Sequence, residues 1–261
     1  MNAEAFAAIA VRLTSGERAQ NGIGTLGERT LHAALKEYYE PLESCREVRL
    51  GRYVADICRI ETAPGGVGDG SIVEIQTRGF FALRKKLEAF LPGHVVTVVY
   101  PIARVKWLSW IDEDTGEVSA RRRSPKVWQP ASILPELYRI EGLLEHPNLR
   151  LCIPCLELEE YRRLNGWSRD RKRGSWRHER IPVALLGEVH VGGAGEYGRL
   201  IPTGLADGFT SKEFAKAAGL SPKAAQTALH VLCHVGAVAR TGKRGRSFVY
   251  AARSPGEQAH T

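Results

Sequence analysis

Three polar residues lie within stretches that are otherwise apolar, and these are the residues whose types and spacing could do chemistry. Asp56 shares an alternating row with apolar neighbours, while Glu74 and Gln76 alternate with them in the segment Ser71 to Arg78. Alternation with period two and β-branched residues predict strands, so Glu74 and Gln76 point to one face. Charged side chains are rarely buried unless they are paired or bind a metal. These acids therefore need an explanation beyond packing.

The surrounding pattern predicts the elements that would position these residues. Gly51 separates two strand-like runs, a Gly- and Pro-rich loop precedes the Glu74 strand, and Pro92-Gly93 ends the amphipathic helix after it. The predicted order is helix, three strands, helix, strand, with these ranges: Thr25 to Tyr39, Arg46 to Leu50, Arg52 to Ile60, Ser71 to Arg78, Gly79 to Leu91 and Val95 to Ile102.

The middle of the chain is less regular. We predict a hairpin over Trp107 to Ser124, a helix over Ser132 to Glu145 and a strand over Leu149 to Leu156. Asn165 to Arg180 shows no periodicity and is strongly basic, with tryptophans interleaved, so we interpret it as a loop. It is either a clamp on a nucleic-acid backbone or a solvated loop; its cations include Arg171, Lys172 and Arg173.

The order of elements from about Gly24 to Arg104 resembles the core of the PD-(D/E)XK nuclease superfamily. The resemblance implies an α/β (α+β) mixed-sheet fold in which Asp56 and Glu74 bind Mg²⁺ or Mn²⁺, and Glu28 on the first helix assists. Gln76 stands where the superfamily usually has a lysine, and an amide is neither a cation nor a base. The sequence thus departs from the pattern at one of its catalytic positions.

Structural roles remain open for the same residues. Asp56 could bridge locally, Glu74 could pair with Arg52 or Arg78, and Glu28 could serve only in the capping box that begins at Thr25. Lys85 and Lys86, with Arg78, are candidates for phosphate contact, or they form a solvated helix face. The pair Cys152 and Cys155 lacks a second cysteine pair at zinc-finger spacing, so we interpret it as core.

The C-terminal stretch from Thr210 to Ala251 has a separate organisation. A short helix capped by Thr210 is followed by a helix that begins at Ser221-Pro222, and two short strands flank a basic turn. This order resembles a winged-helix DNA-binding domain, or a winged helix used for protein contacts. The resemblance implies that the second helix and the turn meet DNA, through Lys223, Gln226, Thr227, His230, Lys243, Arg244 and Arg246.

Bulk properties narrow the class of protein. The net charge of +8 favours acidic partners, nucleic acid before membrane surface. The sequence has no apolar run long enough to span a membrane, and its five scattered cysteines fit a reducing cytoplasm. We expect a cytoplasmic protein that binds DNA and no membrane, and a homodimer is compatible with it.

Together these observations predict a metal-dependent DNA endonuclease, an enzyme that hydrolyses phosphodiester bonds. The alternatives are a DNA-binding regulator on a nuclease-like core that no longer cuts, which Gln76 keeps open, and an adaptor that assembles through its C-terminal domain. The expected domains are an N-terminal helix and linker over 1–20, a nuclease domain over 21–195 with extensions after 105, a winged helix over 203–252 and a flexible tail over 253–261.

Overall fold

The protein is a mixed α+β structure, seen in a computed structural model that describes residues 3–21, 29–59, 69–77, 79–112, 115–167 and 173–253. The chain forms two compact units, each assembled from three separate segments. Unit 1 comprises Met1–Glu43, Ala103–Val127 and Pro154–Gly187, and unit 2 comprises Ser44–Ile102, Trp128–Ile153 and Glu188–Thr261. No helix in the described ranges is long and apolar enough to cross a membrane.

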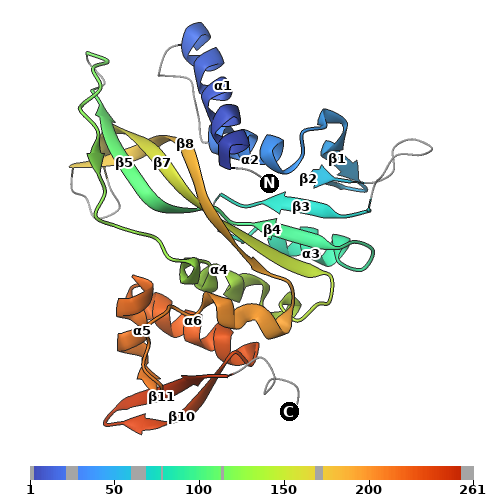
Figure 1. The fold of residues 1–261 in the computed structure, drawn as a ribbon, viewed down its shortest axis with the longest axis vertical. Coiled ribbons are helices and arrows are strands. Elements are labelled where there is room, and N and C mark those ends of the chain that lie inside the picture. Colours follow the sequence, from blue (N-terminus) through green and yellow to red (C-terminus); the bar gives the residue numbers. More distant parts are fainter. Residues whose placement is uncertain are drawn as a thin grey trace. The chain divides into compact units, whose positions relative to one another are not determined.

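The sheet of unit 2 carries the residues on which the chemistry depends (Figure 1). Its strands run in the order β1-β2-β3-β4-β7, with antiparallel pairing among the first three and parallel pairing from β3 onward. The strand bounds are β1 Arg46–Leu50, β2 Tyr53–Cys58, β3 Ile72–Ile75, β4 Val96–Val99 and β7 Leu149–Trp167, of which only the start belongs to this unit. The mixed sheet expected from the sequence is confirmed.

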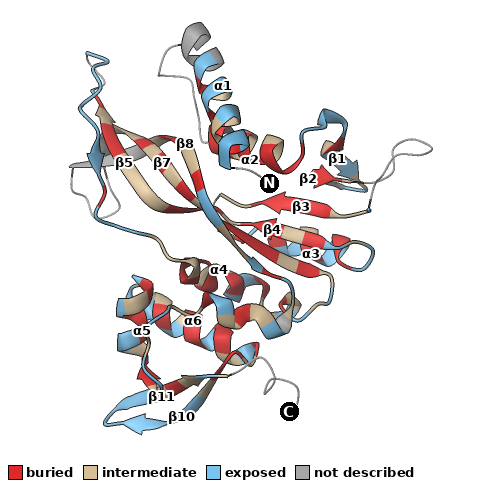
Figure 2. Cartoon of the chain, in the orientation of Figure 1, coloured by how far each residue is buried: buried red, intermediate tan, exposed pale blue. Residues whose placement is uncertain are grey.

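Strand β3 is buried along its whole length, as Figure 2 shows. Strand β3 lies between β2 and β4 and is covered on both faces. Its apolar residues Ile72, Val73 and Ile75 therefore all lie in the core. Helix α3, Leu83–Phe90, buries Leu83, Leu87 and Phe90, and its apolar spacing is the one the sequence displays. Glu74 is the exception to this apolar pattern.

The helix predicted over Ser132 to Glu145 is wrong in its regularity. The structure has a 3-10 turn η2 at Pro130–Ile133, a single α-turn α4 at Leu134–Leu137 and a second 3-10 stretch η3 at Tyr138–Leu143. Pro135 provides no backbone N–H for a continuous helix, and Ile140 leaves the helical region with φ −122° and ψ 22°. A further 3-10 stretch, η4, covers Ala194–Leu200.

The C-terminal part of unit 2 has the predicted element order. Its strand β9 is Phe209–Thr210, its helices are α5 Ser211–Ala218 and α6 Pro222–His234, and its hairpin is β10 Val238–Arg244 with β11 Ser247–Ala252. Thr210 and Glu213 form a reciprocal capping box on α5, and Ser221 caps α6. The three strands form a separate antiparallel sheet in the order β10-β11-β9.

Unit 1 contains helices α1 Ala3–Asn21 and α2 Arg29–Tyr39 together with the strands β5 Ile102–Ile111 and β6 Arg122–Arg123. Phe6 of α1 meets Tyr38 of α2 edge to face, with ring centroids 5.2 Å apart. Strand β5 pairs with β6, which confirms the predicted hairpin.

The prediction of a loop over Asn165 to Arg180 is wrong. Strand β7 runs to Trp167 and β8 spans Arg173–Val191, so most of this basic stretch belongs to two long paired strands (Figure 1). Arg171 and Lys172 lie outside the described residues, as does the side chain of Arg173. The many charged residues of this stretch hide the alternation by which strands are predicted.

Candidate functional site

Asp56 and Glu74 face the same side of the sheet from neighbouring strands. The antiparallel register pairs Ile57 with Val73 and Cys58 with Ile72. Continued by one residue, it sets Asp56 opposite Glu74, and directly opposed residues share a face. Asp56 Oδ2 accepts a hydrogen bond of 2.8 Å from the backbone N–H of Ile75, which fixes its carboxylate at the end of β3.

Glu74 is an acid without exposed surface. Burial raises the pKa of Glu74 to about 7, and the neighbouring Asp56 carboxylate adds to this rise, while the hydrogen bond and charge of Lys86 lower it. Asp56, opposite Glu74 on the neighbouring strand, thus carries a negative charge that disfavours ionisation of Glu74. A buried acid with this pKa changes its protonation state near neutral pH.

Lys86 of α3 is the cation beside these two acids, and we call Asp56, Glu74 and Lys86 the acidic cluster. Its Nζ lies 2.8 Å from Glu74 Oε2 and 3.1 Å from Glu74 Oε1, so it contacts both carboxylate oxygens. Helix α3 thereby brings a positive charge to Glu74, whereas Gln76 is an amide and carries none. The sequence identified Lys86 only as one of the candidate phosphate contacts, and its contact with Glu74 comes from the packing of α3 on the sheet. The neighbouring Lys85 is exposed.

The sequence also assigned Gln76 and Glu28 to this site, and Arg78 to phosphate contact. Gln76 follows β3 directly, is partly buried and donates its backbone N–H to Val99 O at 2.8 Å. Glu28 and Arg78 lie outside the described residues. Arg52, a potential partner of Glu74 by sequence, instead places its guanidinium over the Tyr53 ring, 4.9 Å from the centroid.

The donors of the cluster fit a hard divalent cation. Asp56 and Glu74 offer carboxylate oxygens, which Mg²⁺ and Mn²⁺ prefer. The elevated pKa of Glu74 reflects negative charge that burial leaves poorly solvated, and a divalent ion at this position would stabilise that charge. Lys86 contacts the Glu74 oxygens, so it would have to share them with such an ion.

A second feature of unit 2 combines exposed rings with cations. A groove of about 870 Å³ opens between the start of α3, the α4–η3 segment and the first turns of α6. Phe81 and Tyr138 line it with exposed fractions of 83% and 51%. Its cations are Arg84, Arg139 and Lys223, and we call this surface the aromatic-cationic groove. Such a surface can stack on bases and contact phosphates.

The groove includes two of the residues that the sequence assigned to DNA. Lys223 and Thr227 line it from α6, whereas Gln226 is exposed outside its lining. His230 lies one turn further along, with Nε2 2.6 Å from Glu141 and its ring against Tyr138, at 5.4 Å between centroids. The first part of α6 therefore faces the groove, and His230 is engaged within the protein.

The cations in the basic turn of the C-terminal hairpin differ in the contacts they make within the protein. Arg244 lies 3.1 Å from Glu213 and donates a hydrogen bond of 2.8 Å to Gly208 O. It therefore connects the hairpin to the start of α5. Lys243 lies over the Phe248 ring at 5.3 Å, and both Lys243 and Arg246 are exposed. Lys243 and Arg246 are thus exposed cations of this turn.

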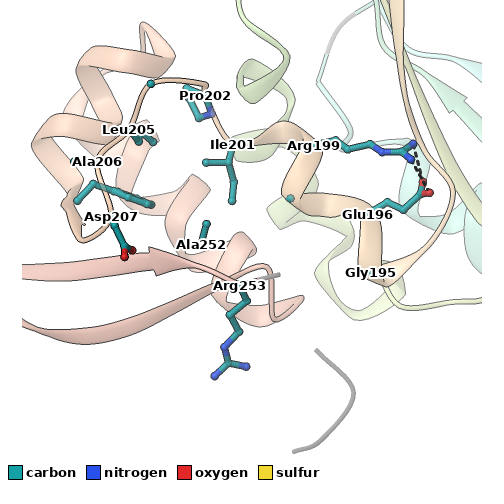
Figure 3. A pocket seen from close by; sticks show the side chains of 13 residues that line it. Gly195, Glu196, Arg199, Ile201, Pro202, Leu205, Ala206, Asp207, Ala252 and Arg253 are labelled. Carbon is teal, nitrogen blue, oxygen red and sulfur yellow. Dashed lines mark hydrogen bonds and ion pairs between the residues drawn. The ribbon is translucent and has the colours of Figure 1, made fainter. Parts of the chain in front are cut away.

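Another cavity, of about 770 Å³, lies between the η4 segment, the stretch before β9 and the end of β11 (Figure 3). Ile201, Leu205 and Ala252 give it apolar walls, and Glu196 and Arg199 form an ion pair beside it. None of its lining residues belongs to the acidic cluster or to the aromatic-cationic groove.

Comparison with protein families gives a match over residues 29–192 to the domain of unknown function DUF8091. The chain belongs to the DUF8091 family. The DUF8091 region contains the whole acidic cluster, from Asp56 to Lys86, and ends before the C-terminal helices and hairpin.

The similarity to one relative is more extensive than the DUF8091 region. An uncharacterized protein of Treponema pallidum (strain Nichols) is 32% identical over 240 residues, which cover 90% of this chain and 89% of that protein. No solved structure matches the chain.

Proposed function

We propose that this protein is a divalent-metal-dependent DNA endonuclease with a PD-(D/E)XK-like core and a C-terminal winged helix. The observation that carries the proposal is the pairing of Asp56 and Glu74 across neighbouring strands, on one face, with Lys86 against Glu74. Two neighbouring carboxylates with a cation beside them can support phosphodiester hydrolysis, by holding a metal and by stabilising charge on the phosphate.

Each residue has a distinct role in this proposal. Asp56 and Glu74 would hold Mg²⁺ or Mn²⁺, which supplies activation of water and neutralisation of charge on the phosphate when bound. Lys86 would orient the Glu74 carboxylate and present positive charge to the phosphate. Gln76 would orient water or a phosphate oxygen through its amide, because it cannot take up a proton.

The C-terminal segment supports DNA as the substrate. Its order of strand, two helices and hairpin resembles that of a winged helix, and its turn carries the exposed Lys243 and Arg246. The aromatic-cationic groove adds aromatic rings and cations at the start of α6, and neither Asp56 nor Glu74 lines it. In this proposal the turn contacts the phosphate backbone, and the groove holds a base or an unpaired end.

A regulator that binds DNA without cutting it is the second candidate. The contact of Lys86 with both Glu74 oxygens favours it, since an ion pair stabilises the acid without a metal. Gln76, in place of a lysine, points the same way. An adaptor function through the winged helix is less consistent with the exposed cations of the turn.

Cleavage of plasmid and oligonucleotide DNA, with Mg²⁺ or Mn²⁺ and beside a gel shift in chelator, distinguishes these functions. We expect cutting by the wild type, at least a hundredfold less by Asp56→Ala and Glu74→Ala, and retained DNA binding by both. Gln76→Ala should be milder, and Gln76→Lys should keep or raise activity. Binding without any cutting supports the regulator, and cutting that survives loss of both acids places the site elsewhere.

A further inference from the structure

Three side chains outside the acidic cluster have the chemistry of a transition-metal site. Cys152 lies on β7, and Glu188 and His190 lie two residues apart on β8, the strand that pairs with β7. One ligand atom of each lies within 4.8 Å of the other two. Residues two apart on a strand share a face, so Glu188 and His190 project together.

The distances suit one small ion. Cys152 Sγ lies 3.6 Å from Glu188 Oε1, and His190 Nε2 lies 3.5 Å from Glu188 Oε2. Zinc bonds of about 2.3 Å to sulfur and about 2.0 Å to nitrogen or oxygen, at tetrahedral angles, separate ligand atoms by roughly 3.3 to 3.5 Å. Both pairs that include Glu188 thus already have the spacing that one ion requires, and the Cys152 and His190 ligand atoms lie within 4.8 Å of each other.

Their surroundings hold them in place. Cys152 is 1% exposed, its backbone carbonyl accepts from Tyr100 N–H at 2.9 Å, and its neighbour strand β4 pairs with it at Val99. Arg199 donates to the carbonyl of His190 at 3.0 Å, which ties the η4 segment to the end of β8. The side chains of Glu188 and His190 are 18% and 59% exposed, so the site is open on the imidazole side.

The cluster is distinct from the proposed catalytic site. The parallel register aligns Glu74 with Val98 and Leu151, so Cys152, the next residue, projects from the opposite face of the sheet. Thiol, imidazole and carboxylate form the ligand set of borderline metals, whereas Asp56 and Glu74 offer only oxygen.

We propose that Cys152, Glu188 and His190 bind a Zn²⁺ ion. Three protein ligands leave a fourth position, open to solvent, for water or an external ligand. Binding converts the Cys152 thiol to a thiolate and releases its proton. The ion would join the ends of β7 and β8 within unit 2.

The test uses the full chain, stripped of metal and titrated with Co²⁺ and Zn²⁺. We expect one thiolate-bound ion per chain, counted by its thiolate-to-cobalt charge-transfer band, and a rise in the thermal unfolding midpoint with Zn²⁺. Cys152→Ser should abolish the band, and His190→Ala should weaken Zn²⁺ binding at least tenfold. Cys155→Ser, three residues along the same strand, should leave both unchanged.

Because Cys152 is buried, its replacement can impair folding, and His190→Ala at an exposed position then carries the test alone. The absence of a cobalt band and of stoichiometric zinc in the wild type would overturn the proposal. So would Zn²⁺ binding of unaltered affinity in His190→Ala, or a cobalt band that disappears in Cys155→Ser and persists in Cys152→Ser.

Discussion

Lys86 Nζ lies 2.8 Å from Oε2 of Glu74, a carboxylate without exposed surface. The contact joins the central strand β3, which carries Glu74, to helix α3, which carries Lys86. The contact has two consequences. It anchors α3 on the sheet, and it brings a cation to the acids that we propose bind metal.

The first prediction concerns the stability of the metal-free protein. The pKa of Glu74 is about 7 in the folded protein and about 4.5 in its ordinary state, so between these values the folded protein holds a proton that the unfolded chain releases. Stability conferred by this group is present at low pH and is lost as pH rises toward 7. Denaturant midpoints measured in chelator should show this fall.

Glu74→Gln provides the comparison for that prediction, since the amide does not titrate. The difference in unfolding free energy between wild type and Glu74→Gln should change across pH 4.5 to 7 and be constant above it. Glu88→Gln, on the exposed end of the Arg84 ion pair, should parallel the wild type. A pH-independent difference for Glu74→Gln would contradict the raised pKa.

The second prediction concerns Lys86 itself. Lys86→Met leaves the Glu74 charge buried without its partner, and removing one partner of a buried pair costs about 3 kcal/mol. The loss should be full at pH 8 and much smaller at pH 5.5, where Glu74 is protonated. Chemical unfolding at both pH values measures it. Lys85→Met, on the exposed side of α3, should stay within about 0.5 kcal/mol of wild type at either pH.

The sequence predicted the alternating strands and the two acids because both depend on local pattern. Asp56 and Glu74 stand out as charges in apolar rows, and the register then follows from keeping those rows in the core. The cation at Glu74 could not be predicted, because Lys86 reaches it by the tertiary packing of α3. A local pattern likewise could not identify β8, whose partner β7 supplies the pairing, or join Cys152 to residues 36 and 38 positions away.

The third prediction concerns the aromatic-cationic groove. If Phe81 and Tyr138 stack on bases, each change to alanine should cost about 1 kcal/mol of DNA binding, roughly fivefold in affinity. The salt dependence should not change, because no cation is removed. Fluorescence anisotropy with duplexes carrying single-stranded ends measures both quantities. Leu42→Ala, another exposed apolar residue, serves as control, and equal affinities in all three variants would exclude base stacking in the groove.

The fourth prediction separates the cations of the C-terminal turn. Lys243→Ala and Arg246→Ala should each flatten the slope of log affinity against log salt by about 0.9, because each removes one phosphate contact. Arg244→Ala should instead lower thermal stability, since its guanidinium is engaged by Glu213 and Gly208. If Arg244→Ala alone changes the slope, DNA contacts a different face of the hairpin.

The fifth and most direct test is the position of Mn²⁺ in a crystal grown with that ion, located by its anomalous scattering. The central claim is that Asp56 and Glu74 jointly bind a divalent metal, so we predict a peak coordinated by both carboxylates, lost in Asp56→Ala. Lys86 should move from at least one Glu74 oxygen to admit the ion. A structure with Mn²⁺ elsewhere, or with Lys86 still on both oxygens and no peak between the two acids, would contradict the claim.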